Sequence, residues 1–77
     1  MAPEFNFGLL TDDELIKICE KGEEGAGYHP FQKASVLLSC RMSETPDAKN
    51  MALETDRWLV ELPEEQIANL RIILEGE

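Results

Sequence analysis

Apolar residues recur at helical spacing directly after a polar start signal at Thr11. Three of them share one helix face, namely Leu15, Ile18 and Cys19. Thr11 and Glu14 have the spacing of a capping box, in which each side chain accepts from the backbone N–H of the other residue. We therefore predict a helix over residues 12–21, with Gly22 as the residue that ends it.

A second apolar run follows a glycine-rich loop over residues 22–29. Pro30 suits the first turn of a helix because its ring fixes φ near the helical value. One stripe at helical spacing then comprises Phe31, Ala34, Leu38 and Met42. Residues 34–40 are apolar on almost every side, so we expect this helix to lie at the centre of the fold.

A third helix is predicted to begin at Pro46, with Thr45 as its N-cap. Its apolar stripe comprises Ala48, Met51, Ala52, Thr55, Trp58, Leu59 and Leu62. Trp58 lies on this stripe and is expected to be a core residue, with an interface anchor as the alternative. A short strand over residues 57–62 is the alternative to the last turns of this helix.

Pro63 is expected to end or bend the third helix, because proline has no N–H to donate within a helix. Beyond it, an inner face of a fourth helix comprises Ile67, Leu70, Ile73 and Leu74. The predicted fold is all-α, a compact bundle of four short helices around a central apolar helix. The bundle has three helices if the last two are continuous through a kink at Pro63.

The domain boundary is predicted at residue 11, with one helical domain over residues 11–77. Residues 1–10 are interpreted as an N-terminal extension without the features of a secretory signal. Glu4-Phe5 is the dipeptide that an EcoRI site encodes, which suggests that residues 1–5 are partly derived from a vector.

The charge of the chain changes what the bundle is expected to bind. The 77 residues carry a net charge of −9, from 16 acidic and 7 basic side chains. This balance argues against a broad basic surface for nucleic acid or anionic lipid. The acidic residues are unevenly distributed along the chain, because residues 25–43 contain Lys33 and Arg41 and no carboxylate.

Few residues are candidates for chemistry. The chain has one histidine, His29, and two distant cysteines, Cys19 and Cys40, so we expect neither a metal site nor a cofactor. No nucleophile motif or phosphate-binding loop occurs, and we expect no catalytic residues and no enzymatic activity. The cysteines are interpreted as buried, reduced thiols of a cytoplasmic protein, with a disulfide between two helices as the alternative.

Two groups of residues are candidates for interaction. Tyr28, His29 and Phe31 gather three rings at the start of the second helix, where they pack onto the bundle or form a recognition patch. Leu53, Val60 and Ile72 are apolar residues that lie off the predicted core stripes. If they cluster, they form a patch for a partner or for a second copy, and we expect a homodimer.

The leading hypothesis is therefore a small acidic, non-enzymatic interaction or regulatory module. It binds a protein partner with a basic surface through an apolar patch with an acidic rim, and it has no membrane-spanning segment. The first alternative is a nucleic-acid-mimicking inhibitor of a nucleic-acid-binding protein, of the kind that phages and mobile elements encode. The second is a helix-turn-helix-like regulator that reads DNA with the helix from Pro46, although its acidic residues make direct nucleic-acid binding unfavourable.

Overall fold

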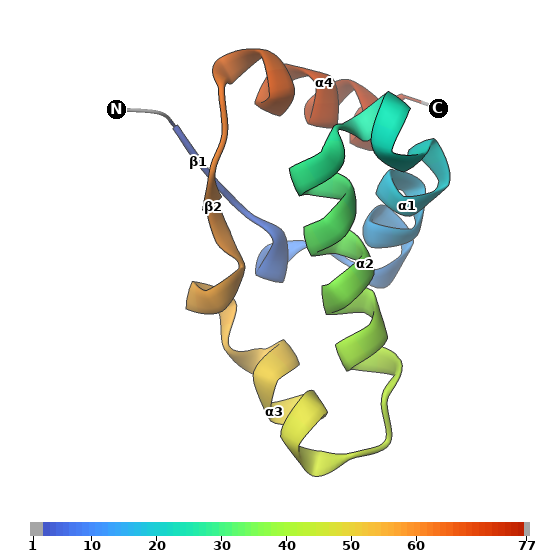
Figure 1. The fold of residues 1–77 in the computed structure, drawn as a ribbon, viewed down its shortest axis with the longest axis vertical. Coiled ribbons are helices and arrows are strands. Elements are labelled where there is room, and N and C mark those ends of the chain that lie inside the picture. Colours follow the sequence, from blue (N-terminus) through green and yellow to red (C-terminus); the bar gives the residue numbers. More distant parts are fainter. Residues whose placement is uncertain (1–2, 77) are drawn as a thin grey trace.

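The fold is a small all-α bundle, as predicted, and the computed structural model describes residues 3–76. Four helices account for most of the chain: α1 (Asp12–Ala26), α2 (Tyr28–Met42), α3 (Pro46–Leu53) and α4 (Glu64–Glu75). Figure 1 shows α4 and α3 at opposite ends of the longest axis, with α2 running between them. None of these helices is long and apolar enough to cross a membrane.

Helix α1 begins as predicted and bends at the predicted glycine. The Glu14 N–H donates to Thr11 Oγ1 at 3.2 Å, and the Thr11 N–H donates to Glu14 Oε1 at 2.8 Å, which completes the capping box. Gly22 has φ +72°, where glycine is favoured, and it interrupts the helix. One further helical turn follows to Ala26, so the predicted loop over residues 22–29 is largely helical.

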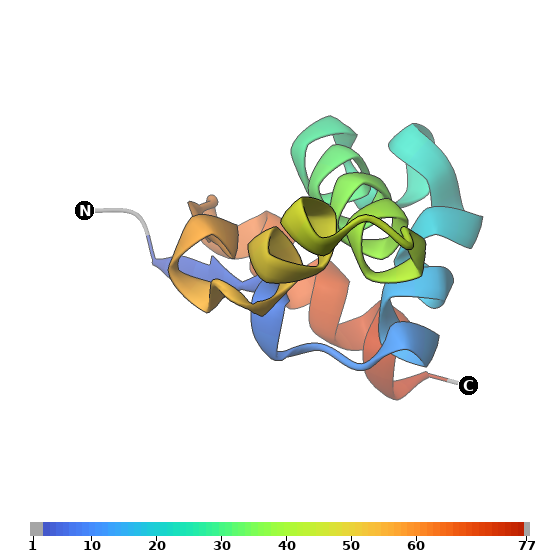
Figure 2. The same ribbon diagram turned by 90° about the horizontal axis from the view of Figure 1, so that it is seen from below.

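Helix α2 starts two residues before Pro30, after Gly27 with φ +99°. Its core side is formed by Pro30, Ala34 and Leu37. Figures 1 and 2 show α1 and α2 lying side by side, and α2 also contacts α3 and the segment before α1. The helix is thus central in its contacts, but it keeps one solvent-exposed face.

The predicted third helix over Pro46–Leu62 is wrong beyond Leu53. The backbone leaves the helix at Glu54 (φ −86°, ψ 86°) and continues as a 3-10 helix, η2 (Thr55–Trp58), and a strand, β2 (Leu59–Glu61). The alternative prediction, a short strand over residues 57–62, is therefore closer to the structure than the continuous helix. Trp58 is buried, as predicted, and its Nε1–H donates to the Met51 carbonyl at 3.2 Å.

The strand β2 needs a partner, and residues 4–6 supply it. The strand β1 (Glu4–Asn6) pairs with β2 in antiparallel register, with Phe5 opposite Val60. A short 3-10 helix, η1 (Phe7–Leu9), follows and places Phe7 in the core with no exposed surface. Residues 4–10, expected to be an extension, thus contribute a strand and a core side chain.

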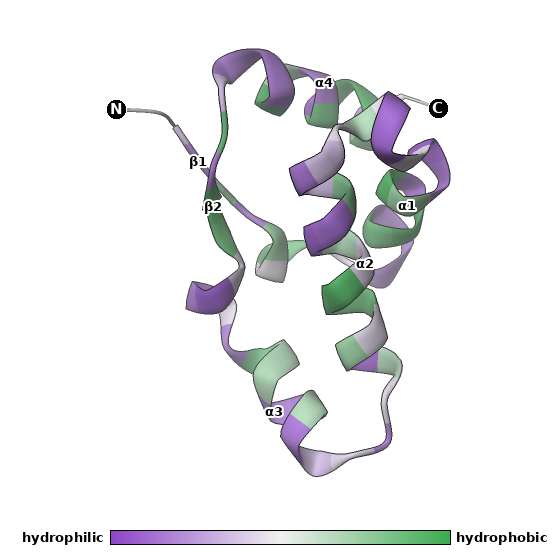
Figure 3. Ribbon diagram, in the orientation of Figure 1, coloured by the Kyte–Doolittle hydropathy of each residue, from purple (hydrophilic) through white to green (hydrophobic). Residues whose placement is uncertain are grey.

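One apolar core joins these elements. Its largest fully buried residues come from η1, the four-helix region and the loop before α4: Phe7, Leu15, Ile18, Pro30, Leu37, Leu62 and Leu70. Figure 3 shows hydrophilic residues at η2, at the end of α1 and at the start of α4, on the periphery of the molecule. The core therefore depends on residues from both termini of the chain.

Candidate interaction surfaces

The structure does not bring Leu53, Val60 and Ile72 together. Leu53 ends α3 and is 78 % exposed, and Ile72 on α4 is 69 % exposed at the other end of the molecule. Val60 is half-buried and packs against the core. Leu53 and Val60 would share a face if one helix carried both, because they are seven residues apart, but α3 ends at Leu53.

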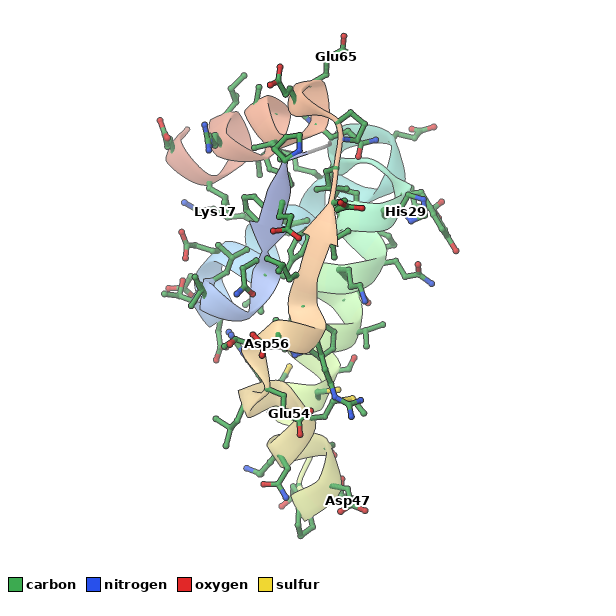
Figure 4. All side chains as sticks on the ribbon, turned by 90° about the vertical axis from the view of Figure 1, so that its left-hand side faces the viewer. Lys17, His29, Asp47, Glu54, Asp56 and Glu65 are labelled. Carbon is green, nitrogen blue, oxygen red and sulfur yellow. The ribbon has the colours of Figure 1, made fainter. Side chains whose placement is uncertain are left out.

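Two of the three aromatic candidates are accessible. Tyr28 is 54 % exposed and its ring meets the His29 ring edge-on, with 5.3 Å between the centroids. Figure 4 shows His29 at the periphery of the bundle. Phe31, one turn further on, is half-buried. The rings of Tyr28 and His29 therefore form part of the outer surface at the start of α2.

A hollow beside Leu53 lies between α2 and α3. Its volume is about 240 Å³, and its lining residues are Arg41, Lys49, Ala52 and Leu53. The Arg41 guanidinium donates to the Gly8 carbonyl at 3.1 Å and pairs with Asp12 at 3.0 Å. Arg41 thereby ties the hollow to the segment that carries Leu9, which is 74 % exposed.

We call this region the Leu53 surface, comprising Leu9, Arg41, Lys49, Ala52 and Leu53. Leu53 and Leu9 are among the most exposed large apolar side chains that the structure describes. Sequence patterns indicated only Leu53 here. Leu9 and Arg41 could not be assigned to this surface from the sequence, because the contact of Arg41 with Gly8 joins residues 33 positions apart and local spacing carries no signal for such a contact.

A second surface follows the outer side of α2. The residues Tyr28, Gln32, Val36 and Ser39 are all exposed and lie three or four residues apart, on one side of the helix. We call them the α2 face. None of them is charged, and the neighbouring Lys33 ammonium lies over the Trp58 ring, 5.4 Å from its centroid.

A third surface is a groove between α1 and α4. It has a volume of about 420 Å³, and Ile72 lies at its edge with Lys21 and Asn69. The Asn69 side chain donates to the Gly25 carbonyl at 2.7 Å and fixes the two helices together. Among residues 3–76, the one charged side chain that lines the groove is a cation, Lys21, so the groove is not acidic.

Cys40 and His29 lie on the same helix, α2, but do not form a reactive pair. Both cysteines are free and half-buried, and burial raises the pKa of the Cys19 thiol, which disfavours the reactive thiolate. Cys40 Sγ lies 3.9 Å from Met51 Sδ. His29 is eleven residues earlier on the same helix, about 16 Å away at 1.5 Å per residue. Residues 3–76 hold no group of three ligands suited to a metal ion.

The alternative of a DNA-reading helix from Pro46 would use Lys49, Asn50 and Arg57 to contact bases or phosphates, and the structure separates these residues. Lys49 and Asn50 lie on α3, which has eight residues, whereas Arg57 lies in η2. Arg57 forms an ion pair with Glu54. These residues therefore do not form one face of a recognition helix.

Comparisons with known protein families, with curated proteins and with solved structures found no match. The surfaces described above therefore provide the basis for a functional proposal.

Proposed function

We propose that this protein is a small acidic, non-enzymatic interaction module of the cytoplasm that binds another protein through the Leu53 surface. The exposure of Leu53 carries the proposal, since 78 % of this side chain is in contact with solvent beside a hollow. A single exposed apolar side chain is common on any protein, so the hollow beside Leu53 is the second observation. Arg41, which lines that hollow, also contacts the segment that carries Leu9.

The preference for a partner with a basic surface rests on the net charge of the chain. Close to Leu53 the charges are mixed, because Lys49 lines the hollow, Arg41 pairs with Asp12, and Glu54 pairs with Arg57. The net charge of −9 adds a long-range attraction for a basic partner, which speeds encounter more than it strengthens the final complex. The apolar contact at Leu53 and Leu9 would then provide the affinity.

Capture from a lysate of the source cells, with quantitative mass spectrometry, tests the proposal. The bait proteins are the wild type, Leu53→Gln and Ile72→Gln. Both replaced side chains are exposed and helical, so neither substitution should change the helical circular dichroism. We expect Leu53→Gln to lose the partner and Ile72→Gln to retain it. The opposite result would move the binding site to the α1–α4 groove and contradict the proposal.

Mimicry of nucleic acid is a second candidate, and one observation favours it. Figure 4 shows that Asp47, Glu54, Asp56 and Glu65 follow one another along the length of the molecule. A row of carboxylates could imitate a phosphate backbone and occupy a nucleic-acid-binding protein. In that case duplex DNA should displace the captured partner, and Asp56→Asn should weaken capture more than Leu53→Gln does. Capture itself should also weaken steeply with salt.

A further inference from the structure

We propose that the α2 face binds the same face of a second copy, so that two molecules pair through antiparallel α2 helices about a two-fold axis. This surface is separate from the Leu53 surface, which remains free for a partner in the paired form. The proposal rests on the exposure, the neutrality and the spacing of Tyr28, Gln32, Val36 and Ser39.

The α2 face has apolar area without a covering element. Tyr28 is 54 % exposed and Val36 is 45 % exposed, two turns apart. Gln32 and Ser39 are exposed between and beyond them, and both are small or flexible enough to accept a close helix. On the opposite side, α2 already packs against α1, α3 and η1. The exposed α2 face is therefore a side of the helix on which another helix can pack.

Charge selects this face for self-pairing. When a surface pairs with its own copy about a two-fold axis, the same residues line both sides of the contact, and if residue i contacts residue j, then j contacts i. The other three helices begin with carboxylates: α1 with Asp12, Asp13 and Glu14, α3 with Asp47, and α4 with Glu64 and Glu65. A contact made by any of these helices would bring carboxylates into the interface from both molecules, which is costly in a molecule of net charge −9.

Helix α2 avoids that repulsion. Residues 25–43 contain no carboxylate. The cation nearest to the face, Lys33, is directed to the Trp58 ring, so it does not add a charge at the centre of the pair. In an antiparallel arrangement, Gln32 of one molecule lies near Val36 of the other, and Tyr28 lies near Ser39. The two helix dipoles are also opposed, which is the favourable arrangement.

The size of the face predicts a weak dimer. A helix of 15 residues is about 22 Å long. One helix crossing of that length lies at the lower end of the range for specific protein interfaces, below about 1,200 Å² in total. We therefore expect an equilibrium between one-chain and two-chain species that shifts with concentration.

Sedimentation equilibrium of the wild type, Val36→Glu and Val36→Lys tests the pairing. The wild-type mass should rise from one chain toward two as concentration increases, and each variant alone should remain at one chain. An equimolar mixture of the two variants should regain the two-chain species, because a glutamate and a lysine then lie on opposite sides of the two-fold axis, about one helical turn apart, where their charges attract. Native mass spectrometry identifies the mixed dimer, since the two variants differ in mass.

Control variants separate this proposal from the function proposed above. Leu53→Gln should pair like the wild type, and Val36→Glu should still capture the partner protein. Gln32→Glu provides a second disruption at an exposed position if Val36→Glu lowers the helical signal. A wild type that stays at one chain throughout, or pairing that survives both α2 substitutions, would overturn the inference without affecting the Leu53 surface.

Discussion

The two sides of the bundle are held together by different means. On one side, α1 and α2 are consecutive helices that pack along their length. On the other side, β1 and η1 meet η2 and β2, which lie about 50 residues later in the chain. These segments have three or four residues each, so none of them is stable on its own.

The second side depends on a few close contacts. A methyl group at Gly8 would lie 2.9 Å from the Thr55 Cα atom, so η1 and η2 approach too closely for a side chain there. The Phe5 and Phe7 rings lie 4.8 Å apart, between strand and core. We infer that many residues share in stabilising the helical side, whereas a few residues provide most of the stability of the strand side.

Phe7→Ala should have the largest effect on the free energy of unfolding. It tests directly whether a few residues stabilise the strand side. Phe7 is fully buried, and removing such a ring costs about 3–5 kcal/mol. A chain of this length has a total stability of only about 4–12 kcal/mol, so much of it would be lost. Urea denaturation followed by circular dichroism measures the change.

Leu9→Ala is the matched control two residues away. Leu9 is 74 % exposed, and the free energy of unfolding should change by less than about 0.5 kcal/mol. If Phe7→Ala and Leu9→Ala had similar effects, residues 4–10 would be an appendage of the helices and the comparison of the two sides would fail.

Thr11→Ala, on the helical side, should lower the free energy of unfolding by less than Phe7→Ala does. It removes the acceptor for the Glu14 N–H, and losing such a cap costs about 1 kcal/mol. Hydrogen exchange should show faster opening in the first turn of α1, with little change in β1 and β2. Equal acceleration in the strands would show that the two sides open together.

The helical side was the part of the fold that local patterns could predict. The Thr11 capping box and the Leu15–Ile18 spacing are signals within one turn, and both are present in the structure. The break after Leu53 was missed because Thr55, Trp58 and Leu62 continue the helical spacing by coincidence. In the fold, Trp58 and Leu62 are buried from a 3-10 helix and a loop.

The strands could not be predicted with the same certainty, because their pairing is long-range. Phe5 and Phe7 do alternate with Glu4 and Asn6, which is the pattern of a strand, but three residues fit many conformations. The pairing partner lies beyond three helices, so only the assembled core selects this register. The Leu53 surface was only partly predicted for the same reason, since Arg41 reaches it through Gly8.

The smallest expected change in stability comes from a pair of like charges that lie opposite each other on the two strands. Glu4 lies opposite Glu61, and the adjacent Leu62 N–H donates to the Pro3 carbonyl at 3.0 Å. Hydrogen-bonded and non-hydrogen-bonded pairs alternate, so Glu4 and Glu61 form a non-hydrogen-bonded pair, in which side chains are closest. Two carboxylates at this position repel each other across the sheet.

Glu61→Lys should therefore stabilise the protein by about 0.2–1 kcal/mol, because the repulsion becomes an attraction. Glu44→Lys is the matched control, since it makes the same change in net charge at an exposed position outside the sheet. Urea midpoints of both variants at low and high salt measure the effect. The gain from Glu61→Lys should exceed that of the control and shrink with salt, because ions screen exposed pairs. An equal gain in stability in both variants would mean that the gain comes from the lower net charge of the chain and not from the contact between the strands.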